Sequence, residues 1–519
     1  VFTYIEKAKA YEGKLNEQEC FKEYFLLQKE FEIKASKVYL YAHLSSDLNK
    51  KDVEKASLVS SCMVLFNNYS EAVSFEEPEL ISLGKEKVFE LLNKCPEIEE
   101  FRFKFEKLFH VASHILSKDI EKVISQLSPA ASTGSNTYSM LAVADGVSEE
   151  VTLSNGTKQL VTQGNWQTLI ESLDNEEDRK LVFESIFKPY EQRKNTFAAI
   201  YESIQKSNKA FMKVRGFNSI LESYLFNNNI PTKVYETLVE VAGSCNESLK
   251  KYIQLRKEYL GLKEYHTYDR FQSLATSNKK YSYEDAKTLF FESIEKYPEA
   301  FRQNAYDALK EGYVDVYEQS GKRTGAYSSG VANIHPYILL NYSDSLEDVF
   351  TVAHEAGHSI HTLFASQAQP VMLQDYTIFV AEVASTVNEL LLFHRKLREC
   401  TDDNEKLYIL NQLMETYKGT LYRQTMFAEF ELLAHEELEK GGVLTPQWLN
   451  DTYEQLNSDY FGPAMGKDEY IKYEWSRIPH FYRGFYVYQY ATGYSAATAI
   501  SSKILNEGTE ARDNYIEFL

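Results

Sequence analysis

The chain has 519 residues, of which 56 are basic and 76 acidic, giving a formal net charge of −20 at pH 7. The acidic residues are spread along the chain, which argues against nucleic acid and anionic membranes as partners. The five cysteines are scattered without a C-x-x-C pair, no run of about 18 apolar residues occurs, and the start lacks a signal-peptide layout. We therefore expect free thiols and a location in the cytoplasm.

Helical periodicity dominates the chain, so we predict a mainly α fold. A short β-hairpin is expected over residues 151–161, because Asn155-Gly156 favours a type I′ turn. We place a soft boundary after this hairpin. It separates an N-terminal helical lobe, residues 1–165, from a second region, residues 166–519, which carries the motifs described below.

Two elements interrupt the helical pattern in the second region. The glycine-punctuated segment 321–330 predicts a flexible loop, and it is not a phosphate-binding loop because Lys322 is followed by Arg323. Segment 336–342 is rich in β-forming residues and has a proline at its start, which predicts a strand. This strand could accept an extended peptide as a further strand, or it could be an ordinary member of a small sheet.

A helix is predicted to open near Leu346. Ser345 precedes it, and Asp348 follows Ser345 by three residues, which is a capping-box spacing. Apolar residues such as Phe350 and Ile360 give this helix a face that can pack. Polar side chains on that face would therefore be partly buried and would need partners.

The most informative motif, His354-Glu355-Ala356-Gly357-His358, lies on this helix. Histidines four residues apart share one helical face, so both imidazoles can bind one Zn²⁺. Glu355 lies about 100° round the helix, beside the metal, where it can take a proton from water. The alternative is a surface helix with two solvated histidines, and the apolar face argues against it.

A catalytic zinc needs a third protein ligand. Glu382 is the best candidate, because it lies among Val380, Ala381, Val383 and Ala384 in a predicted helix, and an isolated carboxylate is costly there without a cation. Glu389 is either an acceptor that orients a ligand imidazole or an ordinary acid on the helix face, and we favour the ordinary acid.

A third segment, residues 478–493, combines one histidine with several tyrosines. Together with HEAGHSIH at 354–361 and FVAEVAST at 379–386, it resembles the oligoendopeptidase F family. That family is part of the metallopeptidases that also include thimet oligopeptidase and neurolysin. The resemblance covers most of the chain and implies two helical lobes that flank a deep substrate channel, with a small sheet next to the zinc helix.

The resemblance also implies roles for individual residues. His354, His358 and Glu382 are the expected ligands of one Zn²⁺ per chain. Glu355 is the expected general base.

The same family pairs a histidine with tyrosines that bind the substrate carbonyl, which suits the oxyanion formed in peptide hydrolysis. His480 matches this histidine. Tyr486 and Tyr490 are four residues apart and share a helical face, whereas Tyr488 does not. We choose Tyr486 first and Tyr490 second, and a purely structural aromatic stripe is the alternative for each tyrosine.

The same residues permit other interpretations. A di-iron bundle needs a second Glu-x-x-His pair on another helix, and no other histidine supplies one. We interpret His361, His394 and His435 as helix-surface or core residues. A peptide-binding scaffold with a structural zinc needs neither Glu355 nor His480.

The sequence therefore predicts a zinc endopeptidase for short unfolded oligopeptides. A protease that attacks folded proteins is a further alternative. The sequence leaves open whether the protein is a monomer or a homo-oligomer.

Overall fold

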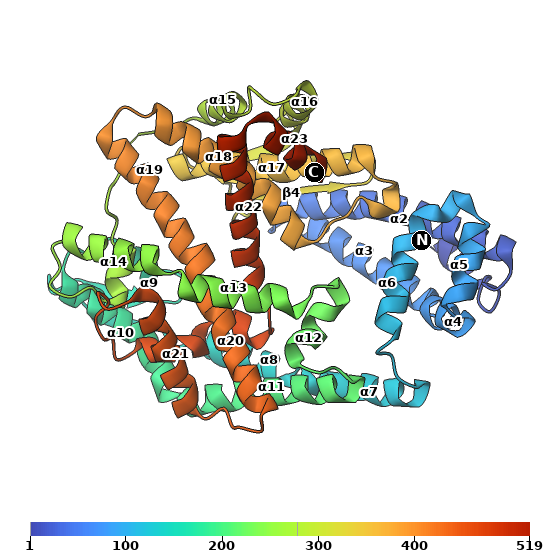
Figure 1. Cartoon of the computed structure of the whole chain (residues 1–519), viewed down its shortest axis with the longest axis horizontal. Helices are drawn as coiled ribbons and strands as arrows, with labels where there is room; N and C mark the ends of the chain where they lie inside the picture. Colours follow the sequence, from blue (N-terminus) through green and yellow to red (C-terminus); the bar gives the residue numbers. More distant parts are fainter. Residues whose placement is uncertain (1, 278) are drawn as a thin grey trace. The chain divides into compact units, whose positions relative to one another are not determined.

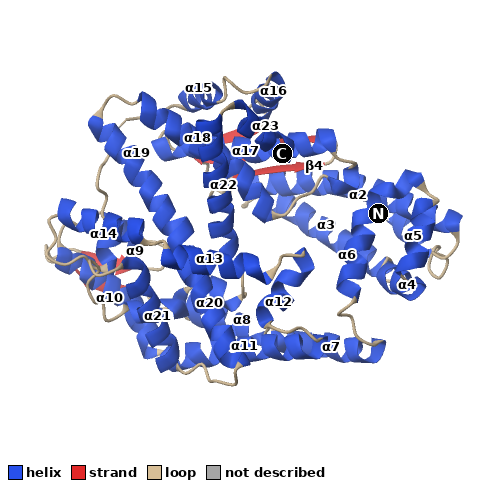
Figure 2. Ribbon diagram, viewed as in Figure 1, coloured by secondary structure: helices blue, strands red, loops and turns tan. Residues whose placement is uncertain are grey.

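A computed structural model describes residues 2–277 and 279–519. The described chain is mainly helical with two small sheets, which confirms the predicted fold class (Figure 2). No helix among the described residues is long and apolar enough to cross a membrane.

The chain divides into two compact units, each made of segments that are distant in sequence. The first unit consists of Val1–Ser113, Asn278–Glu399 and Gly493–Leu519. The second unit consists of His114–Ser277 and Cys400–Thr492. The boundary expected after residue 165 stays a prediction.

The first unit is built from an N-terminal group of helices, a sheet and a second group of helices (Figure 1). Its helices are α1 (Phe2–Lys9), α2 (Gln18–Leu48), α3 (Val53–Ala72), α4 (Glu76–Leu83), α5 (Lys85–Asn93), α6 (Arg102–Ala112), α15 (Tyr283–Ser293), α16 (Glu299–Ala308), α17 (Leu346–Ala368), α18 (Ile378–Glu399) and α23 (Thr509–Phe518). The N-terminal helices bury an aromatic core of their own that includes Phe21, Phe25 and Phe105.

The sheet of the first unit has the strand order β3-β5-β4. The central strand β5 (Ile334–Tyr342) is parallel to β3 (Val314–Tyr317) and antiparallel to β4 (Tyr327–Val331). Both edges of β5 are therefore occupied, so the expectation that segment 336–342 could accept a peptide strand is wrong. Segment 321–330, predicted as a loop, contributes its last four residues to β4.

The helix α17 begins where the sequence predicted. The Ser345 hydroxyl accepts the Asp348 N–H at 3.1 Å, and the Asp348 carboxylate accepts the Ser345 N–H at 3.0 Å. This capping box satisfies N–H groups that a helix start leaves without partners. In Figure 1, α17 lies beside α18 and next to β4, and it contacts both elements.

The second unit is also helical and contains the predicted hairpin. Its helices are α7 (Lys118–Ala131), α8 (Thr133–Ser139), α9 (Trp166–Glu171), α10 (Glu176–Gln192), α11 (Lys194–Arg215), α12 (Ile220–Leu225), α13 (Thr232–Ser244), α14 (Glu247–Tyr259), α19 (Asp403–Thr416), α20 (Arg423–Glu439) and α21 (Pro446–Phe461), and α22 (Tyr488–Glu507) begins in it.

The hairpin pairs β1 (Glu149–Thr152) with β2 (Lys158–Val161). Its turn differs from the predicted type I′, which needs positive φ at both central residues. Gly156 has a φ of 83°, but Asn155 is not among the residues with positive φ. The Asn155 side chain instead accepts the Thr157 N–H at 2.9 Å.

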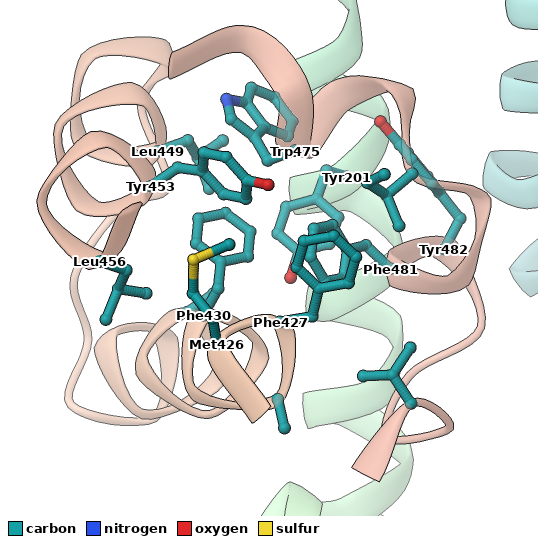
Figure 3. Packing of buried hydrophobic residues seen from close by; sticks show 14 of the residues in the cluster. Tyr201, Met426, Phe427, Phe430, Leu449, Tyr453, Leu456, Trp475, Phe481 and Tyr482 are labelled. Carbon is teal, nitrogen blue, oxygen red and sulfur yellow. The ribbon is translucent and has the colours of Figure 1, made fainter. Parts of the chain in front are cut away.

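Aromatic side chains fill the core of the second unit. Figure 3 shows Phe427 and Phe430 of α20 in one cluster with Tyr201 of α11 and Phe481. The rings of Phe430 and Phe481 have centroids 5.0 Å apart. Because an aromatic side chain buries a large apolar area, this packing holds the segment around Phe481 firmly on α20.

Candidate metal centre

Two histidines of α17 share one face of the helix, as their spacing predicts. The ring centroids of His354 and His358 are 4.9 Å apart, and the ring planes are nearly perpendicular. Both side chains are half-buried. Two imidazoles directed at one region are a natural pair of ligands for a single metal ion.

The helix α18 adds the third donor. Ligand atoms of His354, His358 and Glu382 all lie within 4.8 Å of one another. The Glu382 Oε2 atom is 3.5 Å from His354 Nε2. Two neutral nitrogens and one carboxylate form the donor set of a catalytic zinc site, so the residues present fit this metal.

Gly357 allows α17 and α18 to approach closely enough for this convergence. A Cβ atom at position 357 would lie 2.7 Å from the Ser385 Cα and 3.1 Å from the Ala384 carbonyl oxygen. Any larger side chain would therefore push the two helices apart. Gly493 also approaches α18, because a Cβ atom at this position would lie 3.6 Å from the Glu382 Cβ.

Each ligand histidine has a second partner that fixes its ring. The His354 Nδ1 atom lies 3.1 Å from Glu389 Oε2, and the His358 ring bonds to the Ala381 backbone. Such bonds select the tautomer and leave the other nitrogen for the metal. Our preference for Glu389 as an ordinary helix-face acid is therefore wrong.

The charges of the site favour a cation between the ligands. Burial opposes protonation of His354, but hydrogen bonds to Glu382 and Glu389 outweigh it and raise the pKa of His354 to about 10. Burial and the nearby His354 lower the pKa of His358 to about 4. Burial acts to raise the pKa of Glu382, but the His354 hydrogen bond outweighs it and the pKa is lowered. The carboxylates thus attract one positive charge, which a proton or a metal ion can supply.

Glu355 lies beside the three ligands and differs from them in its environment. Its side chain is 6% exposed, and its Oε2 atom is buried without a hydrogen-bond partner in the described structure. Burial raises its pKa to about 7, against the opposing effect of His354. A carboxylate with a pKa near neutrality can both accept and return a proton.

Strand β4 connects this site to the sheet. The Ser328 backbone N–H bonds to the Glu355 carboxyl, and the Ser328 hydroxyl lies 2.8 Å from that of Ser359 on α17. Strand β4 is an edge strand of the described sheet. Its free edge can therefore add an extended peptide close to Glu355.

The predicted oxyanion residues gather in the second unit. The His480 and Tyr486 rings are 5.7 Å apart and nearly parallel. Tyr490 stands edge-on to both, with its centroid 6.2 Å from His480 and 5.6 Å from Tyr486. Burial and the nearby Arg483 lower the pKa of His480, which favours its neutral form. The structure thus brings these three side chains together.

The remaining histidines behave as core or half-buried residues. His361 is 3% exposed and stacks on Tyr376 at 3.8 Å. His435 is 1% exposed, and its Nδ1 atom lies 2.6 Å from the Glu431 carbonyl oxygen. His394 is half-buried on α18. None of them is among the described residues grouped as metal ligands.

Sequence reasoning missed three contributors to the site: Gly357, the Ser328 N–H and the Ala381 carbonyl. A glycine in the middle of a helix costs stability relative to alanine. Its presence at position 357 could therefore have indicated a close contact with another element. The two backbone groups carry no side-chain signal and become visible only once the strand and helices are placed.

Known peptidases resemble this chain over most of its length. Residues 169–519 match the model of peptidase family M3, and residues 79–146 match the model of oligopeptidase F. The chain is 39% identical over 484 residues to oligopeptidase PepF of Bacillus subtilis, covering 93% of this chain and 72% of that protein. It is 34% identical to the group B oligopeptidase PepB of Streptococcus agalactiae, covering 99% and 86%.

The fold is likewise shared with a solved structure. The crystal structure of oligoendopeptidase-F from Enterococcus faecium matches 99% of this chain and 88% of its own chain, with a TM-score of 0.75 and 32% sequence identity. The family match extends over the metal-ligand helices and the histidine–tyrosine cluster alike. The chain therefore belongs to peptidase family M3, alongside oligoendopeptidase F, and is a metalloendopeptidase that cleaves oligopeptides.

Proposed function

We propose that the protein is a zinc-dependent oligoendopeptidase whose metal is held by His354, His358 and Glu382. The observation that carries this proposal is the convergence of these donors within 4.8 Å of one another. The neighbouring Glu355, with a buried and unpartnered carboxyl oxygen, supports it. When bound, the zinc ion polarises the scissile carbonyl and makes water more acidic.

Glu355 acts as the general base in this proposal. Its carboxylate takes a proton from the attacking water and then delivers it to the leaving amine, which a pKa of about 7 permits in both directions. The Ser328 N–H bonds to the carboxyl and helps to hold it in place, and the unpartnered Oε2 atom remains for the water.

The oxyanion would be stabilised by donors of the second unit. We assign this role to the His480 imidazole and the Tyr486 hydroxyl, with Tyr490 as the second choice among the tyrosines. The mutual packing of these rings supports a shared role, because each restricts the orientation of the others.

The peptide substrate would bind in extended form along the free edge of β4. A cavity of about 360 Å³ borders this strand, lined by residues 328–332 together with residues of α2 and α17. An extended backbone can exchange hydrogen bonds with an edge strand, whereas a folded protein presents few such segments. We therefore expect short unfolded peptides to be cleaved far faster than folded proteins. The cytoplasm remains our predicted compartment.

The variant Glu355→Gln tests the central role. The glutamine keeps the size of the side chain but cannot accept a proton, so we expect peptide hydrolysis to fall by about 10²–10⁴-fold while zinc content stays at one per chain. Glu347→Gln, at an exposed position in the first turn of the same helix, is the matched control and should keep wild-type turnover. Persistent hydrolysis by zinc-loaded Glu355→Gln would refute the general-base assignment.

A further inference from the structure

The segment between η8 (Pro479–Tyr482) and α22 adopts an unusual backbone conformation. Gly484 has a φ of 70° and Phe485 a φ of 45°. A left-handed conformation is natural for glycine but costly for an aromatic residue, and it persists only where the surroundings enforce it. Tyr486 follows directly, so this turn determines where the Tyr486 side chain points.

The side chain of a buried glutamate binds the backbone of this turn. The Phe485 N–H donates to Glu431 Oε1 at 2.9 Å, and Glu431 of α20 is fully buried. Burial raises the pKa of Glu431 to about 8, and the Phe485 hydrogen bond opposes this shift. No arginine or lysine is paired with Glu431 among the described contacts, so the Phe485 N–H is its principal partner.

The side chains around the turn reinforce the same conformation. The Phe485 ring is 3% exposed and lies 5.5 Å from Tyr224, 5.3 Å from Tyr235 and 4.4 Å from His435, between ring centroids. A Cβ atom at Gly484 would lie 2.8 Å from the Tyr224 hydroxyl. Glycine is therefore required at this position both for its φ and for its contact with Tyr224.

The other end of the segment is held by the same helix. Phe481 packs on Phe427 and Phe430 of α20, with centroids 5.2 Å and 5.0 Å away (Figure 3). Helix α20 thus anchors Phe481, which follows His480, and Phe485, which precedes Tyr486. Glu431 is the polar anchor, and the aromatic residues are the apolar ones.

We propose that Glu431 is a positioning residue, which accepts the Phe485 N–H and so fixes the left-handed turn that directs Tyr486 toward the substrate carbonyl. This inference rests on the proposed function of Tyr486. Glu431 itself contacts neither substrate nor metal in this account. Its effect on the reaction runs through the Tyr486 side chain alone.

The experiment compares Glu431→Leu with Glu431→Gln. Leucine removes the acceptor, whereas glutamine can keep an oxygen opposite the Phe485 N–H. We expect Glu431→Leu to lower kcat at least about tenfold with little change in KM, since small misplacement of a donor is costly in the transition state. Glu431→Gln should restore kcat to within about twofold of wild type. Glu429→Leu, which removes a carboxyl from the same helix, is the matched control and should keep wild-type kcat.

Two readouts separate positioning from general destabilisation. In the background of Tyr486→Phe, adding Glu431→Leu should lower kcat by less than about twofold, because both changes remove the same interaction. Deuterium exchange of residues 483–487 should rise in Glu431→Leu and return to the wild-type level in Glu431→Gln. Additive losses of kcat, or unchanged exchange in Glu431→Leu, would overturn the proposal.

A second variant covers the case in which Glu431→Leu fails to fold. Gly484→Ala disturbs the same turn without changing Glu431, because its Cβ atom would collide with Tyr224. It should reproduce the loss of kcat. Gly216→Ala is its control, because Gly216 also has a positive φ of 75° but open space around it. Wild-type kcat in folded Gly484→Ala would overturn the proposal. Faster exchange in Glu431→Leu together with wild-type turnover of Tyr486→Phe would instead refute the oxyanion role of Tyr486.

Discussion

Glu474 in the second unit and Glu355 in the first are both buried glutamates, but their partners differ. Glu474 is 0% exposed and lies 3.1 Å, 2.8 Å and 3.5 Å from Arg270, Arg423 and Arg477. The Tyr453 hydroxyl donates to its second oxygen. Burial alone would raise the pKa of Glu474, but the arginines outweigh it and hold this pKa far below its usual range.

Glu355 has no such compensation. Its nearest charged groups include His354, which favours the ionised form, and Glu382, which opposes it, and burial dominates both. One carboxyl oxygen has no partner among the described residues. A buried carboxylate surrounded by cations stabilises the fold, whereas one left partly unsatisfied is available for chemistry.

The largest effect is expected when a metal ligand is removed. His358→Ala should lose bound zinc and lower peptide hydrolysis by several orders of magnitude, because water activation and carbonyl polarisation depend on the ion. Metal content and turnover are measured together. His394→Ala, on α18 but outside the ligand group, should retain both. Hydrolysis by metal-free His358→Ala at the wild-type rate would contradict the account.

The next largest effect concerns the arginine cluster. Glu474→Gln removes the charge that compensates three arginines, so we expect it to lower the free energy of unfolding by about 3–5 kcal/mol. Glu355→Gln should lower it little or not at all, since it removes a poorly satisfied charge. Chemical denaturation of the two variants measures this difference. Equal destabilisation would abolish the distinction between the two sites.

A smaller effect is expected outside the ligand set. Glu389→Gln weakens the hydrogen bond that orients His354, and we expect zinc affinity to fall by about 10–100-fold. Competition with a chelator gives the affinity. At saturating zinc the turnover of this variant should approach that of the wild type. An unchanged affinity would return Glu389 to the role of an ordinary surface acid.

The pH dependence of stability provides a further contrast within the second unit. Glu474 has a lowered pKa, so its stabilising contribution is present above the unfolded value of about 4.3 and is lost as the pH falls. Glu431 has a pKa raised to about 8, so its contribution is present below about 4.3 and is lost as the pH rises toward 8.

Denaturation curves of Glu431→Gln and wild type between pH 5 and 8 test whether the stabilising contribution of Glu431 falls as the pH rises. The glutamine variant should gain stability relative to wild type as the pH rises. In the folded wild-type protein the buried Glu431 must either hold its proton, which costs more free energy at higher pH, or carry a buried charge, whereas glutamine does not titrate. A constant difference across this range would show that the Glu431 carboxyl does not titrate in it.

Local signals in the sequence were sufficient to select the residues that the structure brings together at the proposed metal site. The capping box at Ser345 fixed the start of α17, and the spacing of His354 and His358 placed both on one face. Glu382 could be chosen because a lone acid among apolar residues demands a cation. These inferences depend on residues of one helix at a time, where periodicity is reliable.

Features that depend on how elements pair could not be predicted in this way. The central position of β5 depends on pairing with β3 and β4, which periodicity does not reveal. The contact of Glu389 with His354 depends on how closely α17 and α18 cross, and Gly357 sets that distance. The conformation of Asn155 likewise depends on strand register and not on its preference alone.

A crystal structure of the zinc-loaded protein, with diffraction measured at the zinc absorption edge, tests the central claim most directly. We predict one anomalous peak about 2.0–2.2 Å from a nitrogen of His354, a nitrogen of His358 and an oxygen of Glu382, with the remaining position taken by solvent. A peak located elsewhere, or a fourth protein atom completing the coordination, would contradict the assignment of this site as the hydrolytic centre.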